Sequence, residues 1–290
     1  MKLFRSTLLG RTLTKVAGHL SAPIVDIVKY VFAEMVYVPR GWHVIKGGWN
    51  DQSVADAQES HWPTLVKNLQ GPGPLGVAHF PWHTTREDRA DHNVMMAFGY
   101  ILALAARKKD ALSILDWGGG VGHYHLYSKA LLPEVRVQYH CYDIPSLCRL
   151  GHKLLPEIHI SDLEADFLER QYDLVLSSSS LHYFEDWRQE VRKLTTVARE
   201  FLYVSRLQTV THASSFVAAH KIHHTGYGEF LSWCINRQEF LNCVEECGLH
   251  LVREFVYYNK WTIRGAPEKG DCRGFLFRRQ PVQAVGVDGA

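Results

Sequence analysis

The sequence predicts an α/β protein in which a doubly wound, mostly parallel sheet follows a helical N-terminal region. Strand-like and helix-like segments alternate after Ala111, the residues before it lack this alternation, and a glycine-rich turn, "GGGVG" at 118–122, follows the first strand. Alternating strands and helices are the pattern of a parallel sheet covered on both faces. We therefore divide the chain into a helical subdomain (1–110), an α/β domain (111–280) and a flexible tail (281–290).

The N-terminal region is predicted to be helical. Residues 1–38 place apolar side chains at helical spacing, and residues 53–70 and 85–109 have the character of longer helices. Glycine and proline repeatedly interrupt residues 71–83, which favours a loop or an extended connector. The acid-free stretch before Asp26 also has the composition of a transit peptide, but basic residues interrupt any run long enough for a secretory signal or a membrane span. We expect this region to form a lid or a homodimer surface.

The α/β domain is predicted element by element from its apolar runs. Aromatic and β-branched runs predict strands at 112–117, 135–143, 158–161, 172–179 and 200–207. The intervening segments predict helices at 122–132, 145–155 and 187–198. A last helix, 236–248, begins at an Asn236 N-cap, and Glu239 completes a capping box. Residues 249–259 and 273–279 are predicted to form a strand pair at the end of the sheet.

Composition argues against several kinds of partner. Lysine and arginine number 32 and aspartate and glutamate 30, which leaves a formal net charge of +2. That balance provides no electrostatic footprint for nucleic acid or for an anionic membrane surface. The 6 cysteines include no C-x-x-C pair, so we expect reduced thiols and a cytoplasmic protein. His220, His223 and His224 are spaced like metal ligands, but no cysteine or carboxylate pair completes a site, so no metal is expected.

The glycine-rich turn predicts the ligand. It lies where a doubly wound sheet brings a ligand against backbone amides and a helix N-terminus. Gly118 and Gly120 fit the first two places of the dinucleotide pattern G-x-G-x-x-G, but His123 takes the third. Asp116 would repel a pyrophosphate and suits an ammonium group, while Asp143, at the tip of the second strand, suits ribose hydroxyls. S-adenosylmethionine (SAM) has the ammonium group and the ribose but no phosphate, so we expect SAM rather than NAD.

Several segments resemble a known family. "ILDWGGGVGHYHLYSKALLP", "YHCYDIP", "YDLVLSSSSLHYFEDW" and "FLYVSRL" are similar to the ordered motifs of class I SAM-dependent methyltransferases. The resemblance implies a Rossmann-like sheet of seven strands of the class I methyltransferase type. More narrowly, "SSSSLHYFEDW", "SSFVAAH" and "YGEFLSWCINRQEFL" resemble a bacterial group of methyltransferases linked to surface-glycan or secondary-metabolite pathways. The resemblance covers residues 111–260 well and the N-terminal region loosely.

From this resemblance, separate groups of residues are expected to hold the methionine part, the ribose and the adenine of SAM and to face the reacting centre. The methionine part would be lined by Gly118, Gly119, Gly120 and Gly122, beside the Asp116 inferred above. Asp143 with Ile144 would hold the ribose, and Asp162 or Leu163 would contact the adenine. Ser178 and Ser179 would face the reacting centre. Trp117 stands where the family pattern has a smaller or polar residue, which leaves the inner shape of the turn open.

Three hypotheses remain open for the reaction. The first is methyl transfer to an oxygen or nitrogen of a small-molecule acceptor, with His182 either a general base or a residue that shapes the cleft, next to Tyr183. Tyr227 either closes over the pocket or belongs to a turn. The second is attack of the α-amino group of SAM on its own γ-carbon, giving azetidine-2-carboxylate and methylthioadenosine, as some relatives of this group are thought to do. The third is SAM binding without turnover.

Overall fold

The computed structural model of the protein describes residues 35–45, 48–50, 52–76, 88–221, 229–257 and 261–280. The described strands are β1 (Met35–Tyr37), β2 (Ala111–Trp117), β3 (Arg136–Tyr142), β4 (His159–Ser161), β5 (Tyr172–Ser178), β6 (Ala198–Val210), β7 (Phe216–Lys221), β8 (Glu229–Asn236), β9 (Leu249–Val256), β10 (Ile263–Arg264) and β11 (Asp271–Arg279). The described helices are α4 (Gln52–Leu69), α5 (Arg89–Ala106), α6 (His123–Leu131), α7 (Pro145–Leu154), α8 (Ala165–Leu168), α9 (Trp187–Val197) and α10 (Arg237–Glu245), with short 3-10 helices η1 (Gly48–Asn50) and η2 (Leu181–Tyr183).

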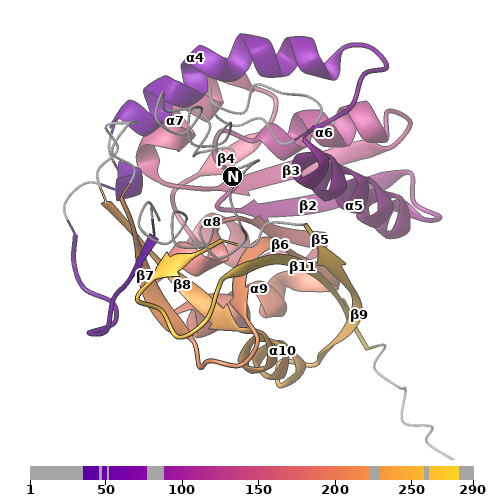
Figure 1. Cartoon of the computed structure of the whole chain (residues 1–290). Helices are drawn as coiled ribbons and strands as arrows, with labels where there is room; N and C mark the ends of the chain where they lie inside the picture. Colours follow the sequence, from indigo (N-terminus) through magenta and orange to yellow (C-terminus); the bar gives the residue numbers. More distant parts are fainter. Residues whose placement is uncertain are drawn as a thin grey trace, which may run out of the picture.

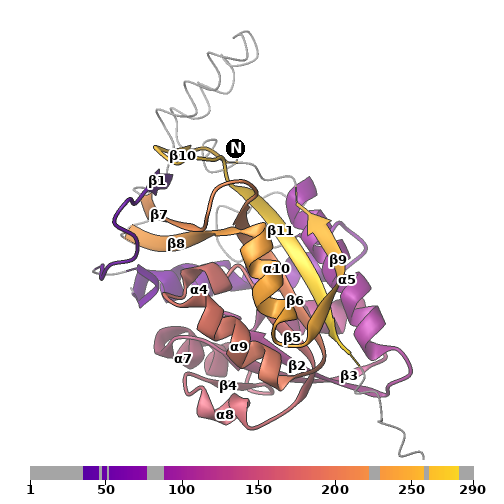
Figure 2. The same cartoon turned by 90° about the horizontal axis from the view of Figure 1, so that it is seen from below.

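Within these ranges the strands form one 11-stranded sheet. Its core runs β4-β3-β2-β5-β6-β11-β9; the first five strands are parallel, and β11 is antiparallel to both of its neighbours. This confirms the doubly wound sheet and the terminal strand pair predicted from the sequence. The remaining strands, β8, β7, β1 and β10, extend the sheet beyond one end of β6 and lie together away from β3 and β4 (Figure 2).

Strand β6 has two successive neighbours along one edge. Its residues from Ala198 to Ser205 pair with β5, whereas Thr209 and Val210 pair with β8. β11 pairs with the other edge of β6 as far as Thr209. β8 therefore pairs with the same edge of β6 as β5, beyond the point where β5 ends. The carboxyl end of β5 therefore faces an interruption in the sheet that begins at Arg206.

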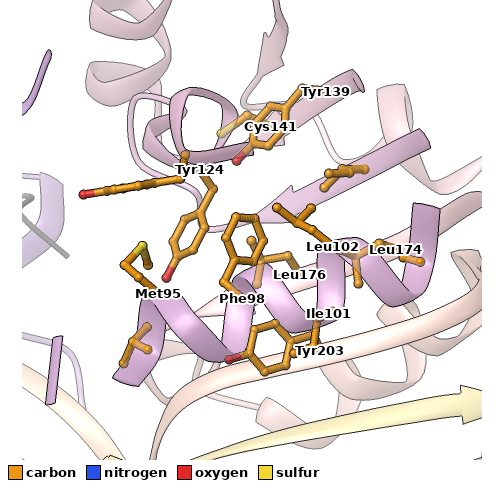
Figure 3. Packing of buried hydrophobic residues seen from close by; sticks show 14 of the residues in the cluster. Met95, Phe98, Ile101, Leu102, Tyr124, Tyr139, Cys141, Leu174, Leu176 and Tyr203 are labelled. Carbon is orange, nitrogen blue, oxygen red and sulfur yellow. The ribbon is translucent and has the colours of Figure 1, made fainter. Parts of the chain in front are cut away.

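The central strands send alternate side chains into two helix layers. Leu112 and Ile114 of β2 join the apolar cluster that contains α5 and α6, and Leu115 and Trp117 join the cluster that contains α9 and α10. Figure 1 shows α4, α6 and α7 on one side of the sheet and α9 and α10 on the other. Figure 3 shows Phe98 of α5 among the strand residues of the first cluster. Burial of such faces is the main favourable term that fixes this layered arrangement.

Two expectations about secondary structure are wrong. Met35–Tyr37 was expected to continue a helix but is a strand paired with β7 and β10. No strand was expected between residues 207 and 249, yet β7 and β8 form an antiparallel pair there, with Phe216 opposite Cys234. In both places pairing with distant strands overrides the local pattern, because a strand's environment depends on its neighbours in the sheet.

The described part of residues 1–110 shares its core with the sheet. Val94 and Phe98 of α5 lie in the same cluster as the strand residues, and Val54 of α4 packs with Leu147 of α7. The boundary predicted at residue 110 therefore does not separate two cores. Residues 1–34 and the predicted tail, 281–290, lie outside the described residues.

The N-cap predicted for α10 is confirmed, but the capping box is not. The side-chain oxygen of Asn236 accepts hydrogen bonds from the backbone N–H groups of Gln238 and Glu239. The Asn236 N–H donates to Ser215 Oγ rather than to Glu239. The Glu239 carboxylate instead accepts from the backbone and hydroxyl of Ser215, so it ties the helix to the segment before β7.

Candidate functional site

A cavity of about 410 Å³ opens at the carboxyl ends of the parallel strands. One half is lined by the turn after β2 and by the ends of β3 and β5; the other is lined by residues 42–45 and 48–50, η2 and the start of β8. Its size falls within the range usual for small-molecule sites. The position matches the general rule that open α/β sheets bind ligands beyond the carboxyl ends of their strands.

The glycines of the turn are needed for two reasons: some lie against other residues of the protein, and some line the cavity. Gly118 has φ +73°, and a Cβ atom there would collide with Ser180. Gly118, Gly119 and Gly120 line the cavity. Gly122 does not: it has φ +90° and lies against Ile158, so its role is packing rather than the predicted contact with the methionine part.

Asp116 lies buried at the end of β2. One oxygen, Oδ2, accepts a hydrogen bond from Tyr139 Oη, and the other, Oδ1, has no hydrogen-bond partner among the described residues. Burial raises the pKa of Asp116 to about 7, against the lowering effect of the Tyr139 bond. A buried polar atom without a partner is rare and calls for a ligand or a water molecule. Asp116 is therefore placed to accept a hydrogen bond from something that enters the cavity.

Asp143 follows β3, the strand next to β2. Its two oxygens accept from the backbone N–H groups of Gly120 (2.6 Å) and Ile144 (2.7 Å). Burial raises the pKa of Asp143 to about 6, although these two bonds lower it. The carboxylate thus fixes the turn, and its remaining lone pairs can still accept a hydroxyl from a ligand.

Aromatic rings line the other half of the cavity. Trp49 of η1 lies with its ring centroid 5.0 Å from that of Tyr183 and 4.8 Å from that of Phe230. Burial raises the pKa of Tyr183, which keeps the phenol neutral. These rings come from three separate segments of the chain, and they offer π faces to a flat or a cationic ligand.

A polar group that sequence reasoning missed connects the two halves. Arg206, in β6, lines the cavity, and its Nε donates to Ser178 Oγ (3.2 Å), which is 2.7 Å from Tyr124 Oη. Arg206 and Ser179 have φ values of +52° and +58°, a strained backbone that costs on the order of 1–3 kcal/mol each. The signal in the sequence was a pair of polar residues, Ser205 and Arg206, directly after the apolar run of a predicted strand.

The structure brings together only part of the predicted site. Ser178, Ser179, Ile144 and Tyr183 line the cavity with the residues described above, whereas Asp162 and Leu163 are exposed and do not line it. Tyr227 lies outside the described residues.

His182 is not part of the cavity lining. It is 1% exposed, neither ring nitrogen has a hydrogen-bond partner in the part of the chain that the structure describes, and burial lowers its pKa well below the usual range. The structure therefore does not support its predicted role as a general base. It stands behind Tyr183, with ring centroids 4.3 Å apart, and supports the position of that ring.

Trp117 and His220 serve structural roles. Trp117 stacks on Tyr142 at 4.0 Å and donates to Glu190 of α9; it packs in the cluster that contains α9 and α10 and does not line the cavity, so the turn keeps its inner space. His220 contacts Ser232 and Gln208 through Nε2. Its neighbours in the sequence, His223 and His224, lie outside the described residues.

Two further properties belong to the described part of the chain. No helix there has both the length and the apolar character needed to cross a bilayer. The cysteines are free thiols, and all except Cys247 are buried.

The strand order and the glycine turn define a Rossmann-like α/β fold with a ligand cavity at its carboxyl edge. No protein-family model and no curated protein matches the sequence.

Solved structures similar to this chain include several methyltransferases. Magnesium protoporphyrin IX methyltransferase from Synechocystis, with S-adenosylhomocysteine (SAH) bound, is 14% identical with a TM-score of 0.45 over 78% of this chain and 98% of that one. The CcbJ methyltransferase from Streptomyces caelestis is 15% identical with a TM-score of 0.47 over 79% and 96%. The 1,6-didemethyltoxoflavin N1-methyltransferase from Burkholderia thailandensis is 11% identical with a TM-score of 0.46 over 87% and 98%.

Proposed function

We propose that the protein is a SAM-dependent enzyme that transfers a methyl group to an oxygen or nitrogen of a small-molecule acceptor. The observation that carries the proposal is the placement of Asp116 and Asp143 at the ends of adjacent strands, on the wall of one cavity with the glycine turn. The acidic pair suits a ligand with a cationic end and ribose hydroxyls, and it disfavours a pyrophosphate.

The residues present fit SAM part by part. The partnerless Oδ1 of Asp116 would accept from the ammonium group, and Gly118–Gly120 would lie against the methionine chain. Asp143 would accept from a ribose hydroxyl, and Ser179 would face the sulfur region. When bound, SAM supplies an electrophilic methyl group on its sulfonium.

The chain's own contribution to the reaction is mainly positioning. Orienting a nucleophile in a dry cavity can contribute about 7–11 kcal/mol to the lowering of a barrier. Burial lowers the pKa of His123, which lines the cavity, to about 3, so this imidazole is neutral and a poor base. The aromatic half excludes water and holds the acceptor body, which favours an acceptor whose nucleophile is reactive without a strong base.

Binding and product analysis test the proposal. Calorimetry with SAM and with SAH should show binding at one site per chain, and NAD should not bind. Incubation of SAM with small-molecule extracts, followed by mass spectrometry, should yield SAH together with a product heavier by one methylene unit. A protein that binds NAD and not SAM would contradict the assignment.

The aromatic group of the cavity favours a second candidate, intramolecular cyclisation of SAM. The rings of Trp49, Tyr183 and Phe230 could stabilise a folded sulfonium through cation–π contacts. The ammonium group would first lose a proton to solvent; the neutral α-amino nitrogen would then form a bond to the γ-carbon as the carbon–sulfur bond breaks and its electron pair leaves with the sulfur. The products are azetidine-2-carboxylate and methylthioadenosine, so incubation with SAM alone separates this reaction from methyl transfer.

Binding without turnover is the third hypothesis, and it would be supported if both assays were silent while SAM still raised the melting temperature. A place in secondary-metabolite or surface-glycan biosynthesis, a cytoplasmic location and a homodimer remain expectations from the sequence.

A further inference from the structure

We propose that Arg206 is a carboxylate-binding residue of the cavity, a role that rests on the proposed SAM-dependent function and defines the charge of the ligand. Arg206 lies where β5 has ended and β8 has not yet begun to pair with β6. It thus stands at the boundary between the glycine-turn half and the aromatic half, within reach of a ligand in either.

A β-bulge aims this side chain into the cavity. Before the bulge, Leu202 and Val204 face the apolar cluster containing α9 and α10, so regular alternation would turn Arg206 toward the same cluster. Instead Leu207 occupies that cluster, and the pairing with β11 shifts between Val204 and Leu207, so β6 carries an extra residue there. Bulges beside active sites commonly redirect a side chain in this way.

The local backbone supports a functional reason for the bulge. Arg206 has φ +52°, a conformation that disfavours any residue with a Cβ atom, and Ser179 beside it has φ +58°. Ser179 N–H donates to the carbonyl oxygen of Ser205, the residue before Arg206, so the two strained positions are linked through one hydrogen bond and one peptide unit. A glycine at position 206 would relieve the strain but would lose the guanidinium group, which suggests that the charge has a use.

Charge then selects the ligand group. Arg206 is the one lysine or arginine among the described residues that line the cavity. A guanidinium close to a sulfonium is unfavourable unless an anion accompanies the cation. A carboxylate provides two oxygens that match the planar guanidinium fork. SAM carries a carboxylate on its methionine part, and an acidic acceptor is the second possible source.

The experiment compares ligands that differ by this one group. Binding of SAM, decarboxylated SAM and methylthioadenosine is measured by calorimetry on the wild type, Arg206→Gln and Arg206→Gly. If the carboxylate belongs to SAM, wild type prefers SAM to decarboxylated SAM by about tenfold or more, and both variants lose that preference while their affinity for methylthioadenosine stays unchanged.

A second arm addresses the acceptor as the source. If SAM affinity is unchanged in the variants, benzoate, used as a probe with and without SAH, should bind the wild type and fail to bind Arg206→Gln. Unchanged affinity for both SAM and benzoate would overturn the inference. A wild type that binds neither SAM nor methylthioadenosine would instead contradict the proposed function, and benzoate alone would then decide the role of Arg206.

Lys108→Gly is the matched control for backbone strain. Lys108 also has a positive φ, +63°, but it does not line the cavity. Both glycine variants should keep or raise the melting temperature, and only the change at position 206 should alter ligand affinity. Equal effects on affinity from the two variants would show that strain rather than the guanidinium group matters.

Discussion

The two halves of the cavity are built in different ways. In the glycine-turn half, a carboxylate such as that of Asp143 fixes the main chain by accepting hydrogen bonds from two backbone N–H groups. In the aromatic half, Trp49, Tyr183 and Phe230 are held by ring contacts between separate segments. A network of charged hydrogen bonds tolerates little displacement, whereas apolar contacts can repack. The first half therefore suits an invariant ligand part, and the second suits the variable partner or conformation.

The largest effect is expected from Gly118→Ala. The new Cβ atom would meet Ser180 and would require a left-handed backbone, so we expect a loss of about 2–4 kcal/mol in the free energy of unfolding and no measurable SAM binding. Gly248→Ala is the control: it has φ +81° but open space around it, and should cost only about 1 kcal/mol. Chemical denaturation and calorimetry measure both. Similar losses in the two variants would mean that the turn is not tightly packed.

Asp116→Asn should follow in size. The amide cannot match a buried carboxylate facing an ammonium group, so SAM affinity should fall about 10- to 100-fold while methylthioadenosine binds as before. Calorimetry with the two ligands measures the difference. An equal loss for both ligands would contradict the pairing of Asp116 with the amino group.

The effect of pH also tests the role of Asp116, because SAM affinity and the stability of the free protein should change with pH in opposite directions. Because burial raises the pKa of Asp116 to about 7, its carboxyl group is protonated as pH falls, and SAM affinity should drop from about pH 8 to about pH 6. The free protein should behave oppositely. Its folded state holds this proton more tightly than the unfolded chain, so its stability falls as pH rises from about 4 to about 7. Asp143, with its pKa raised to about 6, acts in the same direction, and Asp116→Asn should flatten both curves.

A moderate effect is expected from Trp49→Ala in the aromatic half. Turnover should fall by about tenfold, whether the rings hold an acceptor or a folded sulfonium, while SAH affinity changes little. Tyr100→Ala, a half-exposed aromatic on α5 that does not line the cavity, is the control and should leave both quantities unchanged. Strong loss of SAH binding in Trp49→Ala would show that the two halves do not act separately.

The smallest effect is expected from His182→Leu. Since its ring nitrogens have no hydrogen-bond partners within the described ranges, an apolar side chain should change the free energy of unfolding by less than about 1 kcal/mol. The dependence of kcat on pH should keep its shape. A loss of one limb of that profile would restore His182 as a proton-transfer group.

Much of the core, but only half of the cavity, could be predicted from the sequence. The elements from Ala111 to Val197 are local patterns, and "GGGVG" between a strand and a helix carries its own signal. Trp49 and Phe230 meet only because β8 joins the sheet at β6, which no local pattern states. Arg206 was missed for a similar reason, because one extra residue in a strand reverses the direction of its side chain without changing the composition.

The attachment of β8 to β6 affects how freely the two parts of the sheet can change. Within the described residues, the four added strands pair with the seven-stranded core through two residue pairs of β6 and β8, Thr209 with Ile235 and Val210 with Asn236. Because so few backbone pairs make this junction, the added strands can be replaced, lengthened or tilted during evolution while the parallel core keeps its geometry. A new ligand specificity can then arise from changes in the added strands alone.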